Sequence, residues 1–304
     1  MIGNKLFLAM ILVFFGQKVH SAFTSDFGKW LSVHYGDDVR RNLERLDLGD
    51  NGSFGGKKNA SQVARKQPVI FVHGVSSTAG DKMKNSADYF KRHANYENYE
   101  LYGTTYSNGA QGNPLAWAQY KMDCHFVKLV RALIVAVRLY TGRSVDVIAY
   151  SLGVPISRKA IMGGRCVDTG EDLGSSLTKF VDTFVGIAGP NHGISLQVGA
   201  LSLPGCLFSA IPVCNQITGL YSGNCPHESS FLQDINSIQR YEGKNVFSIY
   251  SKADNIVGYK VCEKITTQIA GQNGEKIYPD KNHDHTYYHS FDVQLRMVRD
   301  HVVS

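Results

Sequence analysis

An apolar run that ends in a serine between small residues constrains this chain more than any other feature. The run Val145–Tyr150 is followed by Ser151-Leu152-Gly153 and then by the amphipathic stretch Val154–Met162. A strand that passes directly into a helix needs a sharp turn, at which bulky neighbours would collide with the adjoining strand or helix. The pattern predicts a strand over Val145–Ile148, a strained turn at Ser151 and a helix over Val154–Met162.

The five residues centred on Ser151 match Gly-x-Ser-x-Gly, with Ala149 at the first small position. A preceding strand and a following helix are the context that this motif requires, so the segment resembles the nucleophile elbow of α/β-hydrolases. The alternative is an ordinary strand–helix turn that carries a serine.

Strands and helices alternate along the rest of the chain. The apolar runs predict further strands at Pro68–Val72, Glu100–Tyr106, Phe180–Ala188 and Asn245–Ser251. Apolar residues at helical spacing predict a long helix over Leu115–Tyr140, a closing helix over Tyr288–Val298 and a short helix near Val39–Leu46. This alternation predicts an α/β fold, with a doubly wound, mostly parallel sheet covered by helices on both faces.

The first 22 residues resemble an export signal. Lys5 precedes the apolar run Leu6–Phe15, and Ser21 and Ala22 offer a cleavage site. The run is too short to span a bilayer, so we expect a secreted, extracellular protein without a transmembrane segment. About 280 residues remain, a length that fits one domain over residues 23–304, with residues 23–67 as an N-terminal extension.

Six cysteines follow the signal segment, and an even number in an exported chain predicts disulfides. Fifteen pairings are open, although we expect all six to be oxidised, with one bridge inside Cys206–Cys225. Three of the six lie in the insertion Gly193–Gly243, which is either a stapled structural loop or a wall of the acyl pocket. None has Cys-x-x-Cys spacing, so no zinc site is expected.

The distribution of charge and the glycosylation motifs indicate which partners and modifications to expect. The net charge of +6 is not gathered into a stripe, so no nucleic-acid site is expected. Two sequons, at Asn51 and Asn59, lie in the polar stretch Asp47–Gln67 and predict a glycoprotein.

A serine hydroxyl needs a histidine base and a carboxylate that orients the base, and in α/β-hydrolases the chain order is serine, acid, histidine. Asp254 directly follows the strand Asn245–Ser251, on the same edge of the sheet as Ser151. A turn-forming role for Asp254 is the alternative. Asp182 and Asp234 are weaker rivals, because neither directly follows an apolar strand.

The base must come from the four histidines after Asp254. His301 falls in the closing helix, whereas His283, His285 and His289 cluster in a segment expected to be a loop before it. A metal site is disfavoured, because no glutamate follows His285 as in the zinc-protease helix. We expect His283 to be the base, with His285 as the alternative.

An oxyanion needs preorganised N–H donors. We expect them to be the backbone N–H groups of Leu152 and of Val75, in the loop His73-Gly74-Val75 that follows the strand Pro68–Val72. His73 precedes the serine in the chain and is expected to hold the loop.

Three blocks are together similar to the class 2 lipases: Pro68–Gly74, Ala149–Gly153 and Ser248–Asp254. The resemblance extends from Pro68 to the C-terminus, and the N-terminal extension, the cysteine-rich insertion and the helix-forming tail resemble those of the longer secreted nematode members. It implies carboxylic ester hydrolysis without a cofactor, with acylglycerols as usual substrates, at a lipid–water interface. The alternatives are a small-ester or thioester hydrolase and a catalytically silent secreted binding protein on the same fold.

Overall fold

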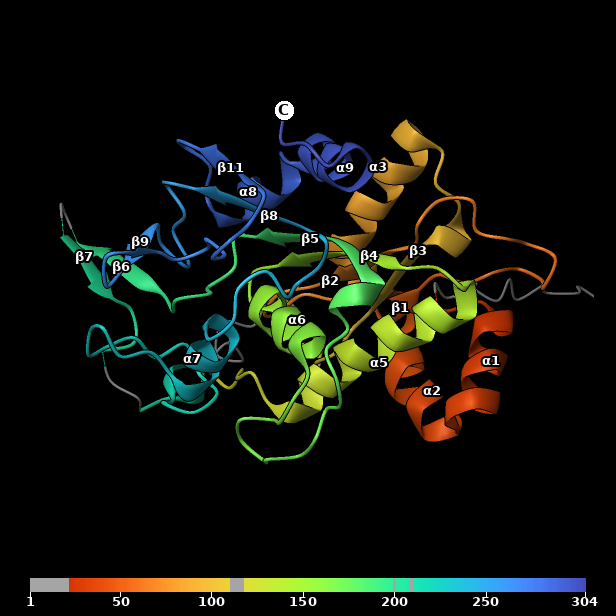
Figure 1. The fold of residues 1–304 in the computed structure, drawn as a ribbon, viewed down its shortest axis with the longest axis horizontal. Coiled ribbons are helices and arrows are strands. Elements are labelled where there is room, and N and C mark those ends of the chain that lie inside the picture. Colours follow the sequence, from red (N-terminus) through yellow and green to blue (C-terminus); the bar gives the residue numbers. More distant parts are fainter. Residues whose placement is uncertain (1–21, 110–117, 199–200, 208–209) are drawn as a thin grey trace, which may run out of the picture.

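The computed structural model describes residues 22–109, 118–198, 201–207 and 210–304. Within them, a seven-stranded sheet has the order β1-β3-β2-β4-β5-β8-β11 (Figure 1). β1 runs antiparallel to β3, and the other neighbouring strands are parallel. The bounds are β1 Ser53–Phe54, β2 Val69–Val72, β3 Leu101–Thr104, β4 Val145–Tyr150, β5 Val181–Ile187, β8 Asn245–Ser251 and β11 Gly274–Tyr278.

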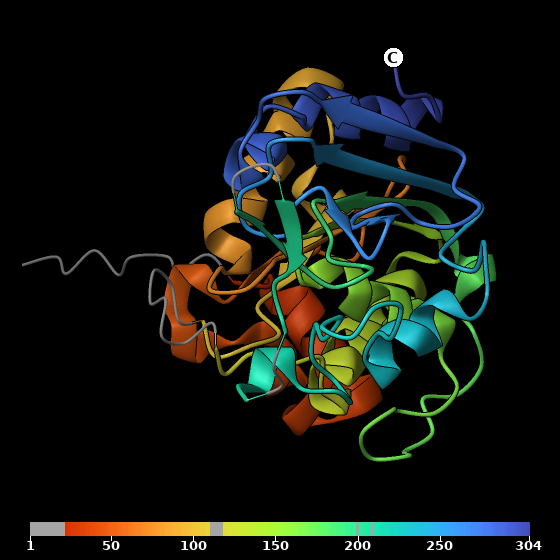
Figure 2. The same cartoon turned by 90° about the vertical axis from the view of Figure 1, so that its left-hand side faces the viewer.

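Helices cover both faces of the sheet (Figure 2). One face packs on α1, α2, α5 and α6, and the other packs on α3, α8 and α9. The bounds are α1 Ser25–Tyr35, α2 Asp37–Glu44, α3 Lys84–Ala94, α5 Cys124–Thr141, α6 Gly153–Met162, α7 Ser230–Asn236, α8 His283–Tyr288 and α9 Phe291–Asp300.

β2 shows why its sequence is continuously apolar. Ile70 and Val72 pack into the core beneath one face, whereas Val69 and Phe71 pack beneath the other. Successive side chains of a strand point to opposite faces of the sheet. When both faces are covered, all of these side chains are buried, so the strand is continuously apolar. The predicted mostly parallel α/β sheet is confirmed.

Two secondary-structure predictions, one of a helix and one of a loop, need correction. Of the long helix predicted over Leu115–Tyr140, residues 115–117 lie outside the described residues, and residues 118–123 are not helical. The helix α5 begins at Cys124, with Asp123 in extended backbone before it. Met122 is buried without being helical, so burial outside a helix produced the misleading periodicity. The predicted histidine loop is the helix α8, which a break at His289 and Ser290 separates from α9.

All six cysteines form disulfides: Cys124–Cys166, Cys206–Cys214 and Cys225–Cys262. The second bridge closes a loop inside Cys206–Cys225, as expected. The third ties the insertion to the turn between β9 (Lys260–Val261) and β10 (Lys264–Ile265). The insertion also contains the hairpin of β6 (Ser195–Val198) and β7 (Leu201–Pro204), and Ser195 N–H donates to the Val257 carbonyl near Asp254. In the described part of the chain, no helix combines the length and hydropathy needed to cross a bilayer.

Candidate active site

Ser151 lies at the turn between β4 and α6, where the backbone is strained. Its φ is 53°, in the left-handed region that residues with a β-carbon avoid. The Ser151 N–H donates to the Ile187 carbonyl at the end of β5. Gly153 permits the tight turn, because a β-carbon there would lie 2.4 Å from the His73 carbonyl oxygen. The sharp turn inferred from the small residues is present.

His283 reaches Ser151 from the first turn of α8. Asn282 caps this helix, since its side chain accepts the His285 N–H at 2.8 Å. His283 Nε2 lies 3.0 Å from Ser151 Oγ, a hydrogen-bonding distance. Both side chains are buried, and the helix start gives the histidine a fixed direction that a free loop would not.

Asp254 lies on the other side of the imidazole. Its Oδ2 is 2.8 Å from His283 Nδ1. Its Oδ1 accepts the backbone N–H groups of Ile256 and Val257 at 2.9 and 3.0 Å, so the carboxylate is held in place from within its own turn. Asn255 Oδ1 accepts the His283 N–H, which joins this turn directly to α8. The structure therefore brings Ser151, His283 and Asp254 into one hydrogen-bonded line.

The loop after β2 borders the serine. A β-carbon on Gly74 would lie 2.6 Å from Ser151 Cβ, so glycine is needed at this approach. Neither the Val75 N–H nor the Leu152 N–H donates a hydrogen bond to another described residue. The loop after β2 and the turn after Ser151 therefore each have a backbone N–H group near Ser151 that makes no hydrogen bond with a described residue.

His73 is completely buried behind this loop. Its Nδ1 lies 2.7 Å from the Gly74 carbonyl oxygen, and its Nε2 accepts the Tyr106 N–H at 3.2 Å. The two bonds require a neutral ring with the proton on Nδ1. Burial accordingly lowers the pKa of His73 from 6.5 to about 4. His73 holds the loop, as expected.

A polar cluster beside His283 was not predicted from the sequence. The Tyr150 hydroxyl donates to Asp284 Oδ1 at 2.7 Å, and Lys82 forms an ion pair with the same carboxylate. Although burial by itself raises the pKa of Asp284, the bonds from Lys82 and Tyr150 hold it below its usual value. The Tyr150 ring also packs on the His283 ring, with centroids 5.0 Å apart. Tyr150 directly precedes Ser151, and this adjacency was the only signal for it.

The rival residues lie elsewhere. His285 and His289 are exposed and contact each other, and His301 is exposed beside Asp182. Asp234 pairs with Lys159. Among the described residues, Cys124, Cys166 and Asp168 also cluster, but the two sulfurs share a disulfide and offer no thiolate to a metal.

Comparisons with known proteins identify the family and the fold of the chain. A model of the family described as Lipase (class 2) matches residues 66–296. Aspergillus fumigatus lipase B superposes with a TM-score of 0.54 at 14% identity, over 86% of this chain and 68% of that chain. Mature Bacillus licheniformis lipase BlEst2 gives a TM-score of 0.50 at 15% identity, over 81% and 97%. A truncated carbohydrate esterase from gut microbiota gives 0.50 at 15%, over 80% and 86%.

None of the curated proteins compared with the chain matches it. At 14–15% identity, the solved structures establish a shared α/β-hydrolase fold. The family match is more specific, since it covers most of the chain and includes the elbow, the Asp254 turn and the start of α8. The chain therefore belongs to the class 2 lipase family.

Proposed function

We propose that the protein is a secreted serine hydrolase of lipase type that cleaves the carboxylic esters of acylglycerols. Family membership supports ester hydrolysis. The observation that carries the finer proposal is the continuous line from Ser151 Oγ through His283 to Asp254, with contacts of 3.0 and 2.8 Å. A serine becomes a nucleophile when a neighbouring base accepts its proton, and this arrangement supplies that base.

In the proposed first step, Ser151 Oγ attacks the ester carbonyl carbon while its proton passes to His283 Nε2. Asp254 accepts the Nδ1–H and stabilises the imidazolium. The negative charge that forms on the carbonyl oxygen is stabilised by the N–H groups of Val75 and Leu152. The intermediate collapses when the carbon–oxygen bond to the alcohol breaks and His283 returns the proton to the leaving alkoxide.

The second step releases the acid. Water loses a proton to His283 as it attacks the acyl-enzyme, and the new intermediate expels Ser151, which regains the proton from His283. Every proton and every bond is accounted for by these residues and water, so the proposed mechanism uses no cofactor.

A fluorophosphonate probe combined with tributyrin hydrolysis tests this function. We expect Ser151 to be labelled and tributyrin to be cleaved, with both lost in Ser151→Ala. Ser157→Ala, in the following helix, is the matched control that keeps both. An unlabelled wild type would indicate a silent binding protein. Labelling with cleavage of acyl thioesters but not of tributyrin would indicate the thioester alternative.

Secretion is part of the same proposal. Three disulfides support an oxidising compartment, because they rarely persist in the cytosol. Of the two sequons, the one at Asn59 is exposed, whereas Ser53 of the other is buried in β1. We therefore expect a glycan at Asn59 and none at Asn51. Peptide mass mapping of protein from a eukaryotic secretory host checks this, and a glycan found only at Asn51 would contradict it.

A further inference from the structure

Three side chains with polar ends gather beside the first turn of α8. Asp284 directly follows His283 and accepts the Tyr150 hydroxyl at 2.7 Å. Lys82 forms an ion pair with the same carboxylate, and its ammonium nitrogen lies 4.7 Å from the centre of the Tyr150 ring. We call these three residues the Tyr150 cluster. The chemical steps proposed above use none of their side chains.

The Tyr150 cluster joins the segments that carry the serine, the base and the loop after β2. Tyr150 ends β4 and directly precedes Ser151. Lys82 lies in the helical turn Ala79–Met83, which follows that loop. Tyr287, also on α8, adds a second link, because its hydroxyl donates to the Lys82 carbonyl at 3.2 Å. The start of α8 is therefore tied both to the elbow and to the chain after β2.

Tyr150 also contacts the imidazole itself. The centroid of its ring lies 5.0 Å from that of His283 and 5.0 Å from that of Tyr287. The residue is 3% exposed, and burial together with the nearby Asp284 carboxylate raises the pKa of its hydroxyl well above the usual value. The hydroxyl therefore keeps its proton and donates a charge-assisted hydrogen bond, which is stronger than a neutral one. A ring fixed in this way limits how far the imidazole packed on it can turn from Ser151.

Charges act on the imidazole from several elements. Asp254, in the turn after β8, lies 2.8 Å from His283 Nδ1. Asp284 interacts electrostatically with the same ring from α8 itself, and Lys82 offsets this charge from the turn Ala79–Met83. Because the last two residues form an ion pair, the Tyr150 cluster adds no net charge beside the imidazole.

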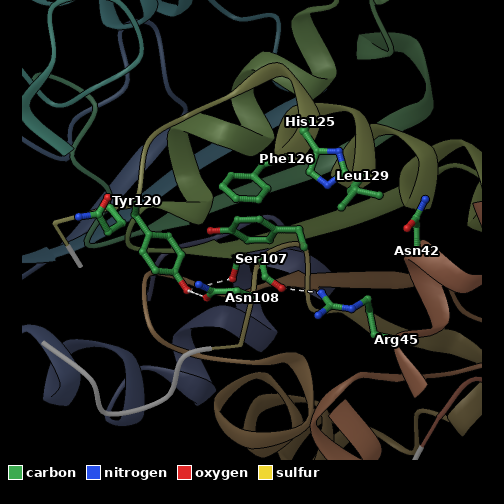
Figure 3. A pocket seen from close by; sticks show the side chains of 10 residues that line it. Asn42, Arg45, Ser107, Asn108, Tyr120, His125, Phe126 and Leu129 are labelled. Carbon is green, nitrogen blue, oxygen red and sulfur yellow. Dashed lines mark hydrogen bonds between the residues drawn. The ribbon is translucent and has the colours of Figure 1, made fainter. Parts of the chain in front are cut away.

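The pocket that opens after β3 takes no part in this arrangement. It has a volume of about 330 Å³ and is lined by α2, the segment after β3 and the start of α5 (Figure 3). The buried His73 and Tyr106 separate it from Ser151. Tyr106 packs into the core beneath one face of the sheet, whereas Tyr150 and Tyr287 pack beneath the other. The Tyr150 cluster thus contacts the base from the face that α8 covers.

We propose that Tyr150, Asp284 and Lys82 are positioning residues for the base. They hold the start of α8 against the elbow, so that His283 keeps its line to Ser151 and Asp254, and their ion pair keeps the charge beside the imidazole balanced. The proposal rests on the proposed ester hydrolysis and adds residues that act through His283 without touching the substrate.

The first test separates kcat from KM on p-nitrophenyl butyrate. Tyr150→Phe keeps the ring that packs on His283 and removes the hydrogen bond to Asp284. We expect kcat to fall about threefold or more with KM almost unchanged, because the base is less well oriented while the substrate contacts remain. Tyr102→Phe is the matched control, since it removes a hydroxyl that donates to the Tyr99 carbonyl on β3, and it should keep wild-type kcat.

The second test measures kcat/KM against pH at the isosbestic wavelength of p-nitrophenol. A base must be neutral to accept a proton, so kcat/KM rises with pH along its acidic limb. Asp284→Asn keeps an acceptor for Tyr150 but leaves Lys82 unpaired, which disfavours the imidazolium and should move this limb to lower pH by about 0.3 pH unit or more. Lys82→Met leaves Asp284 unpaired and should move it to higher pH. The double variant should lie close to the wild type.

Opposite displacements distinguish this role from a merely structural one, which would lower activity without them. Lys128→Met and Glu171→Gln make the same changes of net charge at an exposed ion pair on α5 and the segment after α6, and they should leave the limb in place. If Tyr150→Phe does not fold, the charge variants decide, because Asp284 is half-exposed. Acidic limbs that stay in place in both charge variants, or wild-type kcat in a folded Tyr150→Phe, would overturn the proposal.

An NMR titration of the His283 imidazole in Ser151→Ala separates this proposal from the function. We expect Asp284→Asn and Lys82→Met to displace the titration of this ring in opposite directions in that background too. The same displacements with an inactive wild type would refute ester hydrolysis and retain the action of the Tyr150 cluster on His283. An active wild type whose imidazole titrates identically in both variants would refute the cluster and retain ester hydrolysis.

Discussion

Of the histidines in α8, only His283 has its side chain directed at Ser151. Its two ring nitrogens face Ser151 and Asp254, while His285, two residues later, is exposed. On the first turn of a helix, residues two apart point in different directions, so only one of these histidines can face the serine.

Replacement of His283 by alanine should therefore lower kcat on tributyrin by about 10³-fold or more, as the loss of a triad base does. His285→Ala is the matched control and should retain most activity, since its side chain points to solvent. Steady-state kinetics on both variants checks this. An inactive His285→Ala beside an active His283→Ala would reverse the assignment.

His73 should make stability depend on pH. Burial lowers the pKa of His73 in the folded protein from 6.5 to about 4. Between these two pH values, His73 is mostly protonated in the unfolded chain and mostly neutral in the folded protein. The stabilising contribution is complete above pH 6.5 and is lost as the pH falls toward 4, by up to about 1.4 kcal/mol per pH unit.

Urea unfolding at several pH values between 7 and 4 measures this effect. His73→Asn keeps a donor and an acceptor but does not titrate, so its free energy of unfolding should fall less steeply with acidification than that of the wild type. Parallel curves for the two proteins would show that His73 does not titrate differently in the folded state.

At the scale of elements, the elbow depends on how closely α6 approaches β2. A β-carbon on Gly153 would lie 2.4 Å from the His73 carbonyl oxygen and 2.9 Å from that of Val72. Both of these carbonyl oxygens belong to the backbone of a central strand and the loop after it. They cannot move away by a change of rotamer, as the end of a flexible side chain can.

Gly153→Ala should therefore destabilise the protein by about 1–3 kcal/mol, the usual cost of overpacking, and distort the loop after β2 at the same time. Chemical denaturation together with fluorophosphonate labelling measures both effects. Ser175→Ala, at an exposed position, is the control for handling and should behave as the wild type. A Gly153→Ala variant with wild-type stability would show that the helix is free to retreat.

At the scale of the whole molecule, the disulfides differ in the length of chain that they close. Cys124–Cys166 and Cys225–Cys262 span 42 and 37 residues, and Cys206–Cys214 spans 8. Closing a longer loop removes more conformational entropy from the unfolded chain.

Removing either long bridge by paired alanine substitutions should thus cost about 4 kcal/mol, against about 2.5 kcal/mol for the short one, in the chain-entropy model. Thermal or denaturant unfolding of the three double variants measures the order. A short bridge that costs the most would indicate that native packing around Cys206 matters more than chain entropy.

The sequence by itself determined the features that depend on neighbouring residues. The central strands are apolar because both faces of the sheet are covered, and the small residues around Ser151 reveal the elbow because a strained turn needs them. The sequence was less informative for β11, a half-exposed edge strand with little apolar content. It also misplaced the start of α5, because the buried Met122 lies at helical spacing from the apolar residues of α5 without being helical.

Only the tertiary structure decided features that depend on distances between remote segments. Three pairs of cysteines out of fifteen possible pairings, the contact of His283 rather than His285 with Ser151, and the packing of Tyr150 on His283 could be found only in the folded chain. The same holds for the stacking of Tyr106 on His73, 33 residues apart, which supports the loop after β2 from behind. Local patterns report what one segment needs, whereas these contacts arise because the sheet brings the carboxyl ends of its parallel strands to one edge.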